Sequence, residues 1–218
     1  MPALASPSEL RGLRALVFDV DGTLIDTLPA VQAALNEVLQ ALGEPPLTRE
    51  AVRERLSQGL PGWLPPHLSA HRPLLLQRYQ AHALRLAQPY PQAVALLDAA
   101  RAAGLLLAVC SNGPGEVLLA LLQRFAWQAH FAHLVHADNA QALKPEATPL
   151  LQALQALGCA PEQAWLVGDS DLDAACAQAA GCGFAWFSQG YGRPAAQRPV
   201  ALQFDQHQAL AERLCRGA

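Results

Sequence analysis

Lysine and isoleucine are scarce in this chain. Of its 15 basic residues only Lys144 is a lysine, and Ile25 is the single isoleucine. A genome biased toward GC-rich codons explains this imbalance, because such codons replace lysine with arginine and deplete isoleucine. Arginines on the surface therefore carry little functional meaning here, whereas the one lysine that remains is a candidate functional residue.

Strong charge, long apolar runs and paired cysteines are also missing. The formal net charge of −3 excludes the basic surface of a nucleic-acid-binding protein. No uncharged apolar run reaches the about 18 residues of a membrane span, and residues 1–12 lack the pattern of a secretory signal. The five cysteines form no C-x-x-C pattern, so no disulfide framework is expected. We therefore expect a reduced, cytoplasmic protein with no nucleic-acid or membrane partner.

Apolar residues are abundant and fall into short runs. Hydrophobic residues make up 52% of 218 residues, enough for one domain with a modest insertion. Apolar runs that end in polar residues predict strands over 14–18, 105–110, 132–136, 164–167 and 184–187. Helical patterns lie between them, over 91–103, 115–126, 146–157 and 171–180. This alternation predicts an α/β fold, a Rossmann-like parallel sheet with helices on both faces.

The segment 28–88 interrupts the alternation. It contains an amphipathic helix over 30–42, a helix start at Thr48, a Pro/Gly/Trp loop over 58–67 and a long helix over 69–87, with no visible strand. Pro89-Tyr90-Pro91 is typical of a hinge. We therefore predict a helical cap inserted after the first strand, acting as a mobile lid. The core domain is 1–27 and 89–218, and the cap domain is 28–88.

Carboxylates cluster where two predicted strands end. Asp19 and Asp21 point the same way because side chains alternate along a strand. The full set is Asp19, Asp21, Asp26, Asp169, Asp171 and Asp173. Such crowding favours a cation, and hard oxygen ligands favour Mg²⁺. Two alternatives are helix capping and a calcium loop, but Ala174 and Ala180 stand where a calcium loop needs Gly and Glu.

Phosphate-binding groups follow two other predicted elements. Ser111 and Asn112 stand at a strand end and offer a hydroxyl and backbone N–H groups. Lys144 precedes the helix over 146–157 and can place an ammonium on a phosphoryl oxygen. Gly113-Pro-Gly115 lacks a third glycine, so a helix start explains it better than a nucleotide loop, although it can still help to cradle a phosphate.

Four motifs in this order make the chain resemble the haloacid dehalogenase superfamily, in particular its phosphoglycolate-phosphatase-like branch. They are Phe18-Asp-Val-Asp-Gly-Thr-Leu-Ile-Asp26, Val109-Cys-Ser-Asn112, Lys144-Pro145, and Val167-Gly-Asp-Ser-Asp-Leu-Asp173 followed by Ala179-Ala-Gly181. The resemblance covers nearly the whole chain, with the cap its weakest part. It implies a Mg²⁺-dependent phosphatase that acts on a small phosphorylated metabolite.

The resemblance also implies a role for each carboxylate. Asp19 would be the nucleophile that forms an aspartyl-phosphate, and Asp21 would protonate the leaving oxygen and then activate water. Asp19, Asp169 and the main-chain carbonyl of Asp21 would hold Mg²⁺. Asp173 would orient either Lys144 or a metal-bound water.

The phosphoryl group would be bound by Ser111 and Lys144, with Asn112 assisting. Phosphoryl transfer depends mainly on in-line positioning and charge neutralisation, which agrees with such a set. Ala147 stands where many relatives have a second proline, a departure that should alter a helix start but not the chemistry.

Other activities of the superfamily fit less well. Dehalogenases lack the second aspartate, present here as Asp21, and phosphonate-cleaving members need a lysine in the lid, which this chain does not have. A sugar-phosphate mutase resembling β-phosphoglucomutase is an alternative, because it shares the nucleophile and the acid. A non-enzymatic regulatory binding protein is a second alternative, which the complete set of catalytic residues disfavours.

The cap supplies several cationic or titratable side chains that could recognise a carboxylate or a second anion, as phosphoglycolate requires. They are Arg49, Arg53, Arg55, His67, His71, Arg72, Arg78, His82 and Arg85. Most are expected to be solvated on helix faces. Gly59 is expected at a substrate-facing turn, and Trp63 either faces the substrate or packs between the cap and the core.

Overall fold

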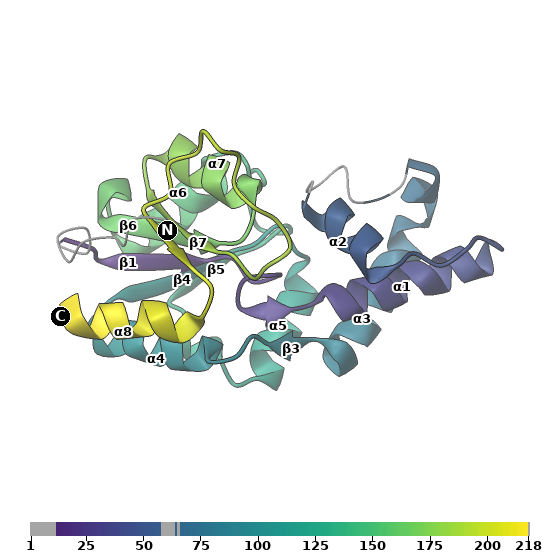
Figure 1. The fold of residues 1–218 in the computed structure, drawn as a ribbon, viewed down its shortest axis with the longest axis horizontal. Helices are drawn as coiled ribbons and strands as arrows, with labels where there is room; N and C mark the ends of the chain where they lie inside the picture. The colour runs from purple at the N-terminus through teal and green to yellow at the C-terminus, as the bar shows by residue number, and fades with distance from the viewer. Residues whose placement is uncertain (1–11, 58–63, 65, 218) are drawn as a thin grey trace.

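The computed structural model describes residues 12–57, 64 and 66–217, and a parallel sheet lies at the centre of the core domain (Figure 1). Six strands of this part of the chain pair in parallel in the order β5-β4-β1-β6-β7-β8. They are β1 (Ala15–Phe18), β4 (Leu106–Cys110), β5 (His133–Val135), β6 (Ala164–Gly168), β7 (Gly183–Phe187) and β8 (Leu202–Phe204). The parallel α/β fold predicted from the sequence is confirmed.

Helices cover both faces of the sheet, because every central strand is apolar on both sides. Leu16 and Phe18 of β1 pack in one hydrophobic cluster, and Ala15 and Val17 pack in the other. Helices α4 (Ala93–Ala102), α5 (Gly115–Arg124) and α8 (His207–Gly217) bury their apolar side chains in the first cluster. Helices α6 (Thr148–Leu157) and α7 (Asp171–Ala180) do so in the second (Figure 1). The central strands are therefore shielded from solvent on both faces.

The predicted helical cap follows β1 and lies to the right of the sheet in Figure 1. It consists of α1 (Leu28–Ala41), α2 (Arg49–Ser57), the 3₁₀ helix η1 (Pro66–His71) and α3 (Arg72–Leu86). Helices α1 and α3 pack against each other around a hydrophobic cluster of their own, which includes Leu35 and Leu75. Thr48 starts α2 as expected, since its hydroxyl accepts a hydrogen bond of 3.2 Å from the N–H of Ala51.

Two short strands join the cap to the core. Strand β2 (Ile25–Asp26) pairs antiparallel with β3 (Gln88–Pro89), so the chain enters and leaves the cap side by side. The prediction that 28–88 contains no strand is wrong at Gln88. Two residues per strand are too few to produce a recognisable alternation of apolar and polar side chains. Gly59 and Trp63, named above for the cap loop, lie outside the described residues.

The last strand and helix were not among the predicted elements. Strand β8 extends the sheet beside β7, and α8 packs against α4 (Figure 1). At the start of α8 the buried His207 ring donates a hydrogen bond of 2.9 Å from Nε2 to the main-chain carbonyl of Thr23. Burial lowers the pKa of His207 to about 4, so the ring is neutral at pH 7. The C-terminal helix thereby supports the loop that follows β1.

The cysteines and the length of the helices bear on two expectations from the composition. All five cysteines are free, and Cys110, Cys159 and Cys176 are buried. None of the helices formed by the described residues is both long enough and apolar enough to cross a membrane.

Candidate active site

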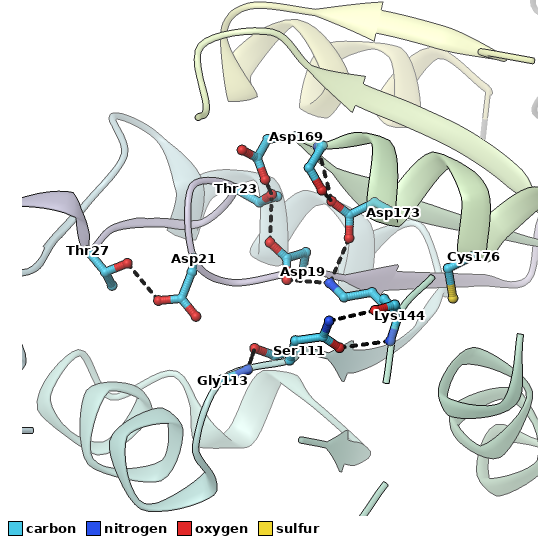
Figure 2. A network of polar contacts seen from close by, with 12 residues as sticks. Asp19, Asp21, Thr23, Thr27, Ser111, Gly113, Lys144, Asp169, Asp173 and Cys176 are labelled. Atoms are coloured by element: carbon cyan, nitrogen blue, oxygen red, sulfur yellow. Dashed lines mark hydrogen bonds and ion pairs between the residues drawn. The ribbon is translucent and has the colours of Figure 1, made fainter. Parts of the chain in front are cut away.

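The carboxyl ends of β1, β4 and β6 meet at the middle of the sheet. From β1 the chain builds the sheet toward one edge through β4 and β5 and then crosses to β6 on the other side of β1, and a parallel sheet has its ligand-binding crevice at such a point. Asp19 follows β1, Ser111 follows β4 and Asp169 is the first residue after β6. Figure 2 shows these side chains gathered together with Lys144. The fold therefore brings together residues that are more than a hundred positions apart in the sequence.

Lys144 is buried between two carboxylates. Its Nζ atom lies 2.6 Å from Oδ1 of Asp19 and 2.6 Å from Oδ1 of Asp173, and its side chain is only 4% exposed. The other oxygen of Asp173 accepts hydrogen bonds from the backbone N–H and the hydroxyl of Ser170, at 3.1 and 2.6 Å. Asp173 therefore completes the capping box of α7 and orients Lys144 at the same time.

Three buried carboxylates form a cluster beside Lys144. One oxygen from each of Asp19, Asp169 and Asp173 lies within 4.8 Å of the others. The hydroxyl of Thr23 lies between two of them, 3.2 Å from Oδ2 of Asp19 and 3.3 Å from Oδ1 of Asp169. Figure 2 shows Thr23 in this bridging position. Thr23 belongs to the first motif, but no role was predicted for it from the sequence.

Burial controls the electrostatics of this cluster. It raises the pKa of Asp19 well above its ordinary value, and the nearby Lys144 ammonium opposes this only in part. Burial, with repulsion from Asp173, raises the pKa of Asp169 to about 7. Burial alone would lower the pKa of Lys144, but attraction to Asp173 and Asp19 outweighs it and keeps the ammonium charged.

The carboxylates of Asp19, Asp169 and Asp173 fit a divalent cation. They offer hard oxygen ligands within 4.8 Å of one another, and the raised pKa of both Asp19 and Asp169 indicates that their negative charges are not fully compensated by Lys144 alone. A divalent cation at this position would stabilise the ionised carboxylates.

The Asp21 side chain faces away from this cluster. Its Oδ1 atom accepts a hydrogen bond of 2.6 Å from the Thr27 hydroxyl and one of 3.0 Å from the Tyr79 phenol (Figure 2 shows the first). Its Oδ2 atom faces Gly113, where an added Cβ would come within 3.0 Å of it. Sequence reasoning missed Tyr79, because a tyrosine on an amphipathic helix gives no sign of a distant partner.

Asp169 is held by the loop that follows β7. Its Oδ2 atom accepts backbone hydrogen bonds from Tyr191 at 2.6 Å and from Gly192 at 3.3 Å. The approach is close: Gly22 has a φ of +85°, and a Cβ there would lie 2.7 Å from Asp169 Oδ2 and 2.8 Å from the Tyr191 ring. Only glycine fits between these groups.

The Tyr191 hydroxyl also fixes the start of the cap. It accepts hydrogen bonds from the backbone N–H groups of Thr27 and Leu28, at 2.6 and 2.8 Å, and donates one of 3.1 Å to Asp26. It thus satisfies the free N–H groups at the beginning of α1. The sequence carried one usable signal, because Tyr191 follows the strand predicted over 184–187 and strand ends of a parallel sheet share one edge.

Ser111 and Asn112 lie at the end of β4 but differ in what they contact. The buried Ser111 hydroxyl accepts a hydrogen bond of 2.9 Å from the N–H of Gly113. The Asn112 amide instead holds the backbone of Lys144, donating to its carbonyl at 2.8 Å and accepting from its N–H at 2.9 Å. The peptide bond between Lys144 and Pro145 is cis. Asn112 therefore fixes the segment that carries the buried ammonium.

Asp171 and Asp26, which were predicted to lie with the other carboxylates, do not reach the cluster. Asp171 accepts hydrogen bonds from the N–H of Ala195 at 2.8 Å and from Nε of Arg198 at 3.1 Å. Its position two residues before Asp173 in α7 turns it about 200° around the helix axis. Asp26 forms an ion pair of 3.0 Å with Arg49 of the cap.

A cavity of about 230 Å³ separates these core residues from the cap. Its core side includes the catalytic candidates Asp19, Asp21, Ser111, Asn112, Lys144, Asp169 and Asp173. Among the described residues its cap side is largely apolar and is lined by Val31, Ala34, Leu56, Arg72, Leu75, Leu76 and Tyr79, with Thr27 where the core meets the cap. Among the cap cations named from the sequence, Arg72 is the one that lines the described part of the cavity. His67, Arg78 and His82 instead contact cap glutamates.

The sequence is similar to that of known proteins over most of its length. Residues 16–187 match the family model of haloacid dehalogenase-like hydrolases. A phosphoglycolate phosphatase from Chromobacterium violaceum is 33% identical, over 84% of this chain and 87% of the relative. An N-acetylmuramic acid 6-phosphate phosphatase from Pseudomonas aeruginosa is 32% identical, over 84% of each chain.

The fold also matches solved structures. The crystal structure of a predicted phosphoglycolate phosphatase from Haemophilus somnus 129PT superposes with a TM-score of 0.84 at 23% identity, covering 92% of this chain and 97% of the other. The family model spans most of the chain, and both relatives exceed 30% identity over more than two thirds of it. The chain therefore belongs to the haloacid dehalogenase-like hydrolase family.

Proposed function

We propose that this protein is a Mg²⁺-dependent phosphatase that hydrolyses a small phosphate monoester through an aspartyl-phosphate intermediate. The observation that carries the proposal is that two neighbouring aspartates, Asp19 and Asp21, have different surroundings. Asp19 lies against the Lys144 ammonium in the buried carboxylate cluster, whereas Asp21 is turned to Thr27 and Tyr79. One is suited to nucleophilic attack and the other to proton transfer.

The proposed reaction has two steps. An Asp19 oxygen attacks phosphorus while the bond to the leaving oxygen breaks, and Asp21 gives that oxygen its proton. Asp21 then takes a proton from a water molecule, which attacks the phosphorus and releases inorganic phosphate with Asp19 regenerated. Ser111 and Lys144 bind the phosphoryl group and neutralise its charge. Asn112 assists by holding the backbone of Lys144.

Asp19, Asp169 and the main-chain carbonyl of Asp21 would hold the Mg²⁺ ion. When bound, the ion supplies charge neutralisation for the phosphoryl group and for the crowded carboxylates. Asp173 supports the site through Lys144.

Mg²⁺ binding is expected to weaken below neutral pH. Asp169, with a pKa raised to about 7, must lose its proton to bind the ion. The apparent Kd should therefore rise at least about tenfold between pH 8 and pH 6, because Asp169 alone accounts for that factor and the pKa of Asp19, a second ligand, is also raised. Mg²⁺ titrations followed by thermal shift at each pH measure this. The Asp171→Asn variant, altered outside the cluster, should behave as wild type, and an affinity independent of pH would contradict the assignment of Asp169.

The cavity favours a short substrate that carries a second anion, as in phosphoglycolate. Its volume of about 230 Å³ is below the roughly 300–1,000 Å³ of pockets for larger ligands. The part of its cap wall that the structure describes is mostly aliphatic, with Val31, Leu75 and Leu76, and offers few hydrogen bonds to the hydroxyls of a sugar. Arg72 lines the same wall and can pair with a carboxylate.

A panel of phosphate esters tests the proposed function. Phosphoglycolate, sugar phosphates and nucleoside monophosphates are incubated with Mg²⁺ or with a chelator, and inorganic phosphate is measured. We expect release that depends on Mg²⁺ and is fastest with phosphoglycolate. Conversion of a hexose 1-phosphate into its isomer without release of phosphate would support the mutase, and inactivity on the whole panel would support a regulatory binding protein.

Replacing Arg72 with Gln is expected to raise the KM for phosphoglycolate by about tenfold or more, because the carboxylate loses a charged partner. The KM for p-nitrophenyl phosphate, which has no carboxylate, should stay unchanged. Arg78→Gln is the matched control, since Arg78 is 52% exposed and pairs with Glu37. Equal changes for both substrates would show that Arg72 does not select a carboxylate.

A further inference from the structure

Tyr79 is a cap residue whose hydroxyl reaches a core carboxylate. It lies on α3, and its ring packs against both the cap cluster and the main core cluster. Its hydroxyl donates a hydrogen bond of 3.0 Å to Oδ1 of Asp21. The phenol thus crosses the boundary between the two parts of the chain at the position of the proposed acid and base.

The two oxygens of Asp21 have different surroundings. Oδ1 accepts hydrogen bonds from both Tyr79 and Thr27. No hydrogen bond from the described residues reaches Oδ2, which lies on the Gly113 side of the cavity. Two donors on one oxygen fix the carboxyl plane and leave the other oxygen free to carry and transfer a proton.

Thr27 contributes from the start of the cap and Tyr79 from the middle of α3. Thr27 directly follows β2, and its backbone is fixed by the Tyr191 hydroxyl at 2.6 Å. Tyr79 lies 58 residues after Asp21 and reaches it only because α3 is seated against the core. Movement of α3 away from the core would break the contact from Tyr79 and leave Asp21 with the Thr27 contact alone.

We propose that Tyr79 is a positioning residue for proton transfer, which fixes the Asp21 carboxyl from the cap so that its other oxygen can transfer a proton to the leaving group. The inference rests on the proposed function, because it assumes that Asp21 is the general acid. Burial and the negative charge of Asp21 raise the pKa of Tyr79 well above its ordinary value, so the phenol remains a donor at every relevant pH.

Such a role has a specific kinetic signature. A benzyl alkoxide leaves poorly without a proton, whereas p-nitrophenolate is a stable anion that hardly needs one. Benzyl phosphate and p-nitrophenyl phosphate have similar shapes and differ mainly in this requirement. Comparing kcat/KM, which reports the first chemical step, therefore isolates the contribution of the acid from that of binding.

The experiment compares Tyr79→Phe with wild type on both esters in the presence of Mg²⁺. We expect kcat/KM for benzyl phosphate to fall about tenfold or more, and that for p-nitrophenyl phosphate to stay within about twofold. Tyr90→Phe is the matched control: Tyr90 also lies at the boundary, packs edge-on against Phe187, and its hydroxyl has no hydrogen bond among the described residues. This control should leave the ratio unchanged.

Asp21→Asn serves as the reference and should lose benzyl phosphate activity selectively. If it does and Tyr79→Phe lowers both substrates equally, or neither, the positioning role is overturned while the proposed function stands. If Asp21→Asn itself shows no selectivity, Asp21 is not the acid, and the proposed function fails together with this inference.

Discussion

Replacing Asp19 with Asn is expected to reduce phosphate release by a factor on the order of 10³ or more. An amide cannot form the acyl-phosphate bond, and nothing in the described site offers a second nucleophile at the same place. The Asp19 carboxylate is fixed by Lys144 at 2.6 Å and lies 3.2 Å from the Thr23 hydroxyl. The measurement is the rate of phosphate release from the best substrate of the panel, at saturating Mg²⁺.

The Asp19→Asn variant should nevertheless fold. Burial raises the pKa of Asp19 well above its ordinary value, so a neutral side chain at this position removes an unfavourable buried charge. We expect a thermal midpoint in chelator equal to or above that of wild type. Asp171→Asn, which removes a carboxylate of the Asp169 motif that lies outside the cluster, should keep activity within about twofold. Turnover near the wild-type rate in Asp19→Asn would falsify the assignment of the nucleophile.

Lys144→Arg is expected to lose activity by a factor of about 10² or more, although it keeps the positive charge. The Nζ atom lies 2.6 Å from both Asp19 and Asp173 in a space that leaves the side chain 4% exposed. A guanidinium is a wide planar fork, so it cannot occupy this space without displacing Asp19. The loss should appear mainly in kcat, because the ammonium neutralises charge that develops on the transferring phosphoryl group.

Lys144→Met removes the positive charge but keeps a long, unbranched side chain at this position. It leaves the carboxylates of Asp19 and Asp173 buried without their cation, and we expect a loss of about 3 kcal/mol in the free energy of unfolding at pH 8 in chelator. Added Mg²⁺ should restore part of this stability but not the activity. Arg198→Gln is the control, because it removes a cation that pairs with the partly exposed Asp171. Near-normal turnover in Lys144→Arg would mean that any cation suffices at this position.

The fold could be predicted in large part from local patterns. Each central strand, such as β1 or β6, is a short apolar run that ends in a polar residue, and both properties are visible within a few positions. Strand β8 and helix α8 were missed, and so was the ribbon formed by β2 and β3. The ribbon strands have only two residues each, and their pairing depends on contacts between segments more than sixty positions apart.

The candidate site could be predicted as a set of residue types but not as a set of contacts. Asp19, Ser111, Lys144 and Asp169 stand at strand ends or before a helix, and strand ends of a parallel sheet share one edge. Asp171 belongs to the same sequence motif as Asp169, yet it faces Arg198, because the rotation of α7 decides which carboxylates converge. Fewer carboxylates therefore converge in the structure than the acidic motif in the sequence contains.

The sequence by itself determined the parallel α/β sheet, the inserted helical cap and the identity of the chemical groups, including the one lysine kept in a chain of arginines. Tertiary structure decided which groups touch: Tyr79 with Asp21, Tyr191 with the start of α1, and Asn112 with the backbone of Lys144. The physical reason is the range of the interactions. Periodicity and strand ends are local properties of the chain, whereas these hydrogen bonds join residues from 32 to 163 positions apart and form only when helices and loops are packed at a definite rotation.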